Sequence, residues 1–588
     1  MAEKNDQYHL ITEYLKVSIP ADPAGCIEIT NHLFDLTISS YEIWINGKKI
    51  DLSLCGKDIC FPLFSEMGST MHLPAPMPLS DQDDIKIGLN TVEIGRLTTG
   101  NRIPAPEKPQ SKHKWRVLRL FARDFDEDLM VDSQAIIGRR ENQTLGFSFF
   151  PFDNRQTYSL WFNSENAELQ PAVVSMLKDI RPQSLGFRLP VDFGRMEADG
   201  TALKCFLKLC KTLEASPHIR IDLNHYCGRE ITEVAQSAFG SLRSEDWWKP
   251  VWYFDFFVGD GFESGISAEE TADKINDLSE RLRSLNPDIK IILTGADPSL
   301  GSAVRWNEEM VTKCCRKIDI FGIQWLFPGV KGWLRGKGPF ETEFATGYSA
   351  ALDQALRITH GMLQNASPDQ SIPVALSCWS YLRAPSQNTA DYRINFSKQD
   401  CFFHASQLNS IIRNSDFVSL AENGPLIGNL GLIQAEGDRI WGSAAYHLQK
   451  LYLDSREIVL KVATIRDKPM QAYSWSGIPG LIEGRDIPYI DVLATRSADA
   501  SNLTLLVLNR HHRKRAHVRV SFRNFADLRP VEAKILRSGK FSFQNTFSKP
   551  ETVYCASIPL GKYKAMDHVN LDLPPYGIIS MTLTASNR

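Results

Sequence analysis

The order of apolar and polar residues divides the chain into segments that differ in the periodicity of their apolar positions. In the first segment, YEIWINGKKIDL, DIKIGLNTVEIG and KWRVLRLFARDF read as strands, the first of them alternating apolar and polar residues around an NG turn. The polar, Pro-rich stretch 98–114 predicts a long loop. We therefore predict a β-rich domain over residues 1–144. It is either a sandwich resembling a carbohydrate-binding module or a structural cap.

From about residue 145, short apolar runs alternate with amphipathic stretches of helical period. Helices are predicted over 167–180, 201–215, 268–287 and 399–415, and Ser267 is a plausible N-cap for the third of them. Strands are predicted over 144–152, 184–193, 218–226, 251–261, 289–297, 318–329, 372–380 and 417–431. This alternation predicts an α/β fold, a (β/α)8 TIM barrel over residues 145–454.

After about residue 455 the pattern returns to short strands separated by turn residues. Segments such as NLTLLVLNRH and AHVRVSFRNF predict a C-terminal β-sandwich over residues 455–588. In a TIM barrel the chemistry lies where the strands end. The polar residues at those predicted ends are Asp192, Asp222, Asn224, Asp260, Gln324, Cys378 and Glu422.

Composition and charge exclude several classes of partner. The net charge of −3 offers no basic field for nucleic acid or for an anionic membrane. The N-terminus lacks a signal-peptide pattern and no apolar run reaches about 18 residues, so we expect a cytoplasmic protein with mostly reduced cysteines. Neither a phosphate-binding glycine loop nor paired His and Cys ligands occur, so we expect no cofactor and no metal.

Several longer sequence segments resemble those of the family 51 glycoside hydrolases, the α-L-arabinofuranosidases. The stretch from VWYFDFFVGDGFESG to DIKIILTGAD resembles the region of strand 4 in that family. LLVLNRHHRKRAHVRVSF and LDLPPYGIISMTL resemble its C-terminal sandwich, and GSAAYHLQKLY the helix that precedes it. The resemblance covers about residues 145–585 and implies a retaining glycosidase. Family members often form oligomers, so the resemblance is compatible with a homo-oligomer of this chain.

The resemblance also implies two catalytic glutamates, which this chain lacks. In retaining glycosidases one carboxyl protonates the leaving oxygen and another attacks the sugar from about 5–5.5 Å away. The family's acid/base position falls on Gly261, in Gly259-Asp260-Gly261. Its nucleophile position falls on Cys378, in Ser377-Cys378-Trp379-Ser380. The sequence motifs of the scaffold therefore match the family, whereas the two motifs that carry its catalytic glutamates do not.

Three residues remain candidates for altered catalysis. Cys378 is either a nucleophile, if a nearby group such as His225 activates its thiol, or a small apolar residue filling the space of a glutamate. Asp260 and Glu263 are either substitutes for the missing acid or solvated loop carboxylates.

Other residues are candidates for substrate binding at the barrel mouth. They are Gln324, Trp325, Trp379, Asp192, Asn224, His225 and Glu422. The two tryptophans are either platforms for a sugar ring or part of the core. Asp222 and Arg188 are expected to form a buried pair inside the barrel, because an isolated charge there must find a partner.

Two functions follow as hypotheses. The first is a diverged enzyme of arabinofuranosidase ancestry, acting on a glycoside or another polyhydroxylated small molecule in a biosynthetic or modifying step. The second is a non-catalytic pseudo-glycosidase that binds a carbohydrate-like ligand or a protein partner. An unaltered arabinofuranosidase is disfavoured, because loss of such groups costs orders of magnitude in rate.

Overall fold

The computed structural model describes the greater part of the barrel and of the C-terminal domain, and four strands near the N-terminus. The described residues are 10–21, 41–45, 48–49, 88–98, 125–141, 143–149, 161–163, 168–189, 201–240, 248–258, 267–296, 301–327, 346–381, 396–428, 431–436, 439–465, 472–475, 484–511, 514–539, 543–560 and 567–585. Among them, no helix is long and apolar enough to cross a membrane.

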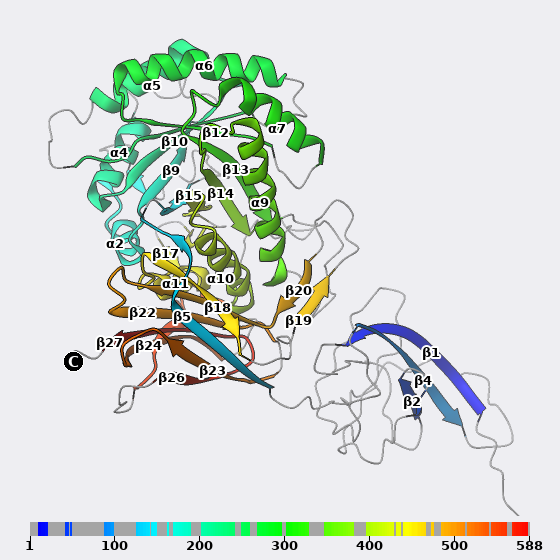
Figure 1. Ribbon diagram of the computed structural model, residues 1–588. Coiled ribbons are helices and arrows are strands. Elements are labelled where there is room, and N and C mark those ends of the chain that lie inside the picture. The colour runs from blue at the N-terminus through cyan, green and yellow to red at the C-terminus, as the bar shows by residue number, and fades with distance from the viewer. Residues whose placement is uncertain are drawn as a thin grey trace, which may run out of the picture.

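Eight parallel strands close into the predicted barrel (Figure 1). In chain order they are β6 (Thr144–Ser148), β9 (Ser184–Arg188), β10 (Ser216–Asp222), β11 (Tyr253–Phe257), β12 (Lys290–Thr294), β13 (Ile320–Phe327), β14 (Val374–Tyr381) and β15 (Val418–Asn423). Each pairs with the next, and β15 returns to β6, which closes the ring. The predicted α/β barrel is therefore confirmed, and each predicted strand has a counterpart.

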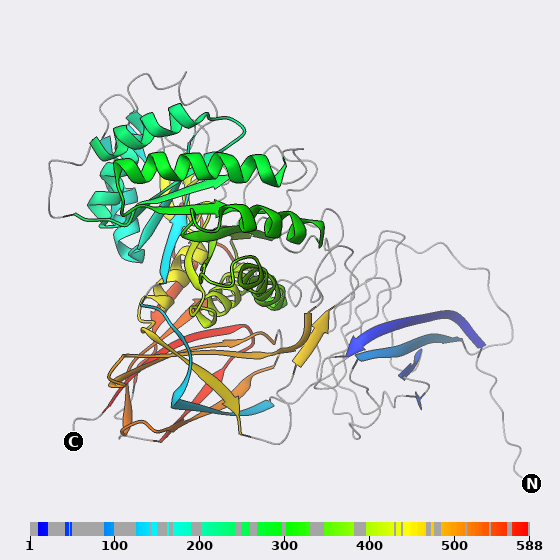
Figure 2. The ribbon, with the colours of Figure 1, turned by 45° about the horizontal axis from the view of Figure 1, so that its top comes forward.

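Helices surround the barrel (Figures 1 and 2). They are α2 (Pro171–Ile180), α4 (Thr201–Leu213), α5 (Gly228–Gly240), α6 (Ala268–Leu285), α7 (Gly301–Cys314), α9 (Ser349–Ala366), α10 (Lys398–Arg413) and α11 (Ala444–Tyr452). Ser267 caps α6 as predicted: its side chain accepts from the backbone N–H of Glu270, whose carboxylate accepts from the N–H of Ser267. Helix α5 was absent from the predicted elements. Its buried residues, Ile231, Val234, Ala235, Ala238 and Phe239, follow the i, i+3, i+4, i+7 spacing of an amphipathic helix, so the signal was present in the sequence.

The C-terminal domain is a nine-stranded sheet in which one strand comes from before the barrel. The order is β25 (Val553–Ser557), β24 (Leu528–Ser538), β27 (Gly577–Ala585), β22 (Asn502–Asn509), β21 (Ile490–Arg496), β18 (Ile458–Thr464), β5 (Phe125–Arg139), β23 (Ala516–Arg523) and β26 (His568–Leu573). The strands fold into the layered, sandwich-like body below the barrel in Figure 1.

Strand β5 corrects the predicted boundary at residue 144. It pairs antiparallel with β18 over one half of its length and parallel with β23 over the other, so it lies inside the C-terminal sheet. Burial alternates along the strand from Phe125 to Ser133. The buried positions include Glu127 and Ser133, so the sequence alone gives no clear strand pattern here, and these residues were counted with the N-terminal domain.

Near the N-terminus, β1 (Leu10–Ala21), β4 (Gly88–Thr98), β2 (Tyr41–Ile45) and β3 (Lys48–Lys49) form an antiparallel sheet in that order. The pairs Trp44 with Lys49 and Ile45 with Lys48 fit the hairpin expected around the NG sequence. The predicted loop 98–114 lies outside the described residues, apart from Thr98 at the end of β4.

A buried carboxylate ties the sandwich to the barrel. Asp491 of β21 accepts hydrogen bonds from Arg510 at 2.7 Å and from Asn409 of α10 at 3.0 Å, and it also pairs with Arg413 of the same helix. This buried carboxylate helps to fix the position of α10 on the sheet, because moving the helix would break its bonds to Asn409 and Arg413. The two bodies therefore share one interface.

The position of β5 predicts how the chain tolerates shortening. A chain that begins at residue 125 keeps every strand of the nine-stranded sheet, whereas one that begins at residue 145 loses β5 and separates β18 from β23. We expect the first to unfold cooperatively in urea and the second to be unfolded or aggregated, as measured by tryptophan fluorescence. Equal unfolding midpoints for the two chains would contradict the assignment of β5.

Candidate functional site

The barrel interior is built in layers, because alternate residues of each strand point inward. One layer is apolar and consists of Tyr253, Ile292, Ile320, Ala375 and Leu420. Two residues further along the same strands come Asp255, Thr294, Gly322, Ser377 and Glu422. The second layer is therefore polar and contains two carboxylates.

A histidine joins these two carboxylates. His218 of β10 lies with Nδ1 2.9 Å from Glu422 Oε2 and with Nε2 3.3 Å from Asp255 Oδ2, and all three side chains are fully buried. Asp255 also accepts from Arg220 Nε at 2.9 Å. Ser184 donates to Glu422 at 2.7 Å. With the imidazole protonated, two cations face two anions in the interior.

Two hydroxyl groups, on β12 and β14, extend this network. Thr294 donates to Asp255 Oδ1 at 2.6 Å, and the hydroxyl of Ser377 lies 2.8 Å from that of Thr294. Because Thr294 has one proton and gives it to Asp255, Ser377 is the donor between the two hydroxyls. Ser377, next to Cys378, is thus bound into the interior.

Two glycines make room for these polar groups. A Cβ on Gly186 would lie 2.1 Å from Glu422 Oε2, and a Cβ on Gly322 would lie 2.2 Å from Thr294 Oγ1 and 2.5 Å from Ser377 Oγ. No larger residue fits at either position without moving a network member, so both glycines are required by close approach.

The charges in the network shift each other's protonation. For His218, burial alone would lower the pKa, but the charge of Glu422 and hydrogen bonds to Asp255 and Glu422 outweigh it and raise the pKa to about 9. For Asp255, burial alone would raise the pKa, but Arg220 and His218 outweigh it and lower the pKa to about 2. At neutral pH this histidine is an imidazolium held between two carboxylates.

Cys378, which the sequence resemblance assigns to the nucleophile position, is a reduced cysteine with 0% of its surface exposed. Its Cα is paired with that of Gln324 on β13, beside irregularities in the register of β14 with both of its neighbours. Gln324 itself is partly exposed. The structure thus places the thiol within the barrel wall and the amide beside it.

Trp325 and Trp379 lie in the core between the strands and the helices, each with 1% exposed. Trp325 stacks on Tyr348 at 5.2 Å between ring centroids, and Trp379 lies 5.5 Å from the ring of His404 on α10. The core interpretation of both residues holds, and the platform interpretation does not fit side chains so fully covered.

Asp222 organises the end of β10. It pairs with Arg188 at 3.3 Å as predicted, although the Arg188 side chain is 26% exposed rather than buried, and its Oδ1 accepts from the backbone N–H of Asn224 at 3.0 Å. His225, with 41% of its side chain exposed, has Nε2 3.8 Å from Asp222 Oδ2. Asn224 is exposed as well. This end of the barrel therefore presents an imidazole and an amide to solvent.

Glu422 lies elsewhere than predicted. We expected it at the barrel mouth, but it is fully enclosed and bonded to His218 and Ser184 in the second interior layer. The register pairs Glu422 with Gly146 near the middle of β6, which explains this depth. Asp260, Glu263, Gly261 and Asp192 lie outside the described residues.

Sequence reasoning missed His218, Arg220 and Asp255. The available signal was polar residues at every second position in HIRID and at the centre of YFDFF, inside runs that otherwise read as buried strands. Among the described residues, no group of three or more His, Cys, Asp or Glu side chains is arranged to hold a metal ion.

The chain is similar to α-L-arabinofuranosidases in its C-terminal region and in its fold. Residues 377–577 match the family model of the α-L-arabinofuranosidase C-terminal domain. No curated protein matches the chain significantly in sequence.

Solved structures show the same fold. The α-L-arabinofuranosidase of Thermotoga maritima, in its arabinose complex, has 16% identity and a TM-score of 0.64, over 78% of this chain and 100% of that one. The family 51 arabinofuranosidase of Xanthomonas axonopodis pv. citri has 16% identity and a TM-score of 0.62 over the same shares. That of Bifidobacterium longum has 11% identity and a TM-score of 0.63, over 78% and 99%. The family 51 resemblance is confirmed in fold and in the C-terminal region.

The raised pKa of His218 predicts a loss of stability at alkaline pH. The contribution of the His218 imidazolium to the free energy of unfolding is fully present below the pKa of an unfolded histidine, about 6.5. It is lost as pH rises through the folded pKa of about 9. We expect the free energy of unfolding in urea to fall by on the order of 3 kcal/mol across that window.

The variant His218→Gln separates this effect from others. It should unfold about 3–5 kcal/mol more easily at neutral pH, because two buried carboxylates lose their cation. Its free energy of unfolding should also not decrease between pH 6.5 and 9 as that of the wild type does. His517→Gln, which changes an exposed histidine, is the matched control. An unchanged alkaline slope in His218→Gln would refute the role given to this imidazole.

Proposed function

We propose that the chain is a glycosidase-derived protein that binds a carbohydrate-like ligand at its barrel mouth without hydrolysing it. One observation carries the proposal: the thiol of Cys378, the residue that the sequence resemblance assigns to the nucleophile position, is fully enclosed in the barrel wall. A nucleophile must reach the anomeric carbon of a bound sugar, which a side chain with no exposed surface does not. The acid/base position holds Gly261, which has no side chain to donate a proton.

The acids of the barrel interior support the same proposal. Asp255 and Glu422 are bound by His218 and its neighbours, and Asp222 is bound by Arg188. A general acid needs a raised pKa and a path to the leaving oxygen. Asp255 has a pKa lowered to about 2 and no exposed surface, so it meets neither condition.

Polar groups at the strand ends support ligand binding. His225 and Asn224 after β10 are exposed, and Gln324 on β13 is partly exposed. Imidazole and amide groups both donate and accept hydrogen bonds, which suits the hydroxyl groups of a sugar. Ligands of TIM barrels bind at this end of the strands.

A second candidate function is an altered glycoside-processing enzyme. The observation that favours it is the pairing of Asp222 with the exposed His225, because a carboxylate beside an imidazole orients that imidazole for proton transfer. Asp260 and Glu263 would then be the sequence candidates for a further acid near the same end of the barrel.

The test measures binding and turnover on the same protein. Isothermal titration calorimetry with arabinose and short arabino-oligosaccharides should show binding, and His225→Ala or Gln324→Ala should weaken it about tenfold, through loss of one or two hydrogen bonds. Analysis of the titrated sugars should show no released monosaccharide.

His517→Ala, an exposed histidine on the sandwich, controls for nonspecific effects of the substitutions. Release of monosaccharide that His225→Ala abolishes would replace the binding proposal by the enzyme. Absence of binding at millimolar sugar would rule out both functions for these ligands.

A further inference from the structure

We infer a second saccharide-binding site, on the face of the barrel opposite its mouth. A cavity of about 340 Å³ opens there, between the end of α5 and the segments that lead into β11 and β12. Its lining includes Phe239 from the last turn of α5, Trp252 directly before β11, and Asn286 and Asp288 between α6 and β12. All these segments precede the strands, so the cavity is separate from the strand ends that form the mouth.

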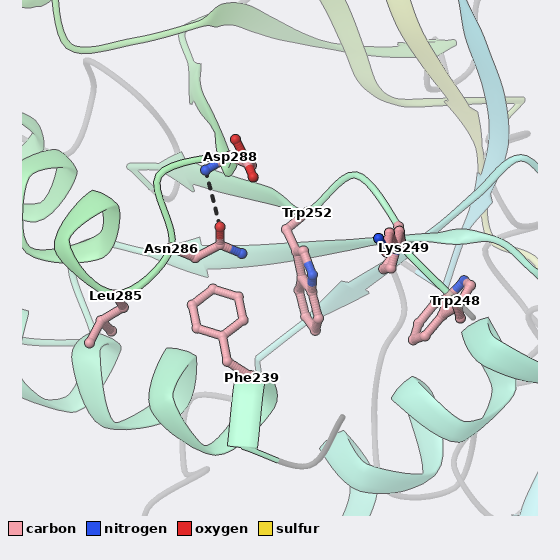
Figure 3. A pocket seen from close by; sticks show the side chains of 8 residues that line it. Phe239, Trp248, Lys249, Trp252, Leu285, Asn286 and Asp288 are labelled. Atoms are coloured by element: carbon pink, nitrogen blue, oxygen red, sulfur yellow. Dashed lines mark hydrogen bonds between the residues drawn. The ribbon is translucent and has the colours of Figure 1, made fainter. Parts of the chain in front are cut away.

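Aromatic side chains form the apolar part of this cavity. Figure 3 shows the indole of Trp252 between the rings of Phe239 and Trp248. Phe239 packs edge-to-face on Trp252 with 4.9 Å between ring centroids, so the pair is held rigidly. Trp252 is buried, whereas Trp248 is partly exposed and presents indole surface to a ligand.

Polar groups surround these rings. Asn286 Oδ1 accepts from the backbone N–H of Asp288 at 3.0 Å, which fixes the amide and leaves its NH2 group without a partner among the described residues. The carboxylate of Asp288 and the ammonium group of Lys249 also have no partner among the described residues. Both side chains are exposed. The cavity thus offers an amide donor, a carboxylate acceptor and an ammonium donor.

This combination fits a neutral sugar better than other ligand classes. The apolar C–H face of a sugar ring packs on an indole, while its hydroxyls need both donors and acceptors around the edge. Lys249 and Asp288 carry opposite charges, so neither an anionic nor a cationic ligand is favoured. The volume lies in the range of about 300–1,000 Å³ typical of small-molecule sites and accommodates one or two sugar rings.

The inferred role is to hold a saccharide chain away from the mouth. The site does not depend on the proposed function of the mouth, since no residue is shared between them. A ligand anchored at both faces of one barrel gains effective concentration at the second site, provided that it is long enough to span them.

The experiment uses the full chain and three neutral probes, arabinotriose, xylotriose and cellotriose. Dissociation constants are measured by isothermal titration calorimetry for the wild type, Trp248→Ala and Asp288→Asn. At least one trisaccharide should bind, and Trp248→Ala should weaken it about tenfold or more through loss of the indole face. Asp288→Asn keeps the shape of the site and removes its charged acceptor, so it should weaken binding even if Trp248→Ala disturbs folding.

Two controls separate this site from the mouth. The double variant His225→Ala/Gln324→Ala changes only the mouth and should leave the Trp248-dependent binding intact. Phe547→Ala removes an exposed aromatic ring on the sandwich and should have no effect. The inference is overturned if no trisaccharide binds, or if Trp248→Ala and Asp288→Asn bind as the wild type does. Binding lost only in the mouth variant would also overturn it, while supporting the function proposed for the mouth.

Discussion

The structure depends on pairing of charges inside a closed barrel. An ionised carboxylate in a fully enclosed space is costly unless a cation and hydrogen bonds compensate it. His218 meets this need for Glu422 and Asp255 at once, with Arg220 and Ser184 completing the set. The arrangement links β9, β10, β11 and β15, and through Thr294 and Ser377 it reaches β12 and β14. It therefore fixes the register of most of the barrel.

The same constraint determines what the interior acids can do. A carboxylate held by a protonated imidazole and a guanidinium is a weak base and has no proton to give. Asp255 thus serves the scaffold, Glu422 is enclosed beside His218, and Ser377 turns inward toward Thr294 rather than toward the mouth. Next to it Cys378 fills the wall, and Trp379 packs on α10. Three successive residues of β14 thus pack within the protein and leave no exposed reactive group there.

Much of the fold could be predicted from the sequence, because alternating runs of period two and period 3.6 place β10, α6 and their counterparts without any knowledge of long-range contacts. Residues 125–139 were counted with the N-terminal domain, whereas they form β5, whose partners β18 and β23 lie more than 300 residues away in the chain. Helix α5 was missed although Ile231, Val234 and Phe239 recur at helical spacing on its buried face. At the site, the changed residues Gly261 and Cys378 were visible in the sequence, whereas the depth of Glu422 and the role of His218 depend on register and burial, which no local pattern reveals.

The central claim, that Cys378 has become a packing residue, is tested most directly by its reactivity. Alkylation with a small reagent between pH 6 and 9, followed by peptide mass spectrometry, compares Cys378 with the exposed Cys227, and Cys378→Ala confirms the peptide assignment. The account predicts modification of Cys227 and none of Cys378 in the folded chain, because the thiol has no exposed surface. Selective alkylation of Cys378 well below pH 8 would reveal an accessible, activated thiolate and contradict the account.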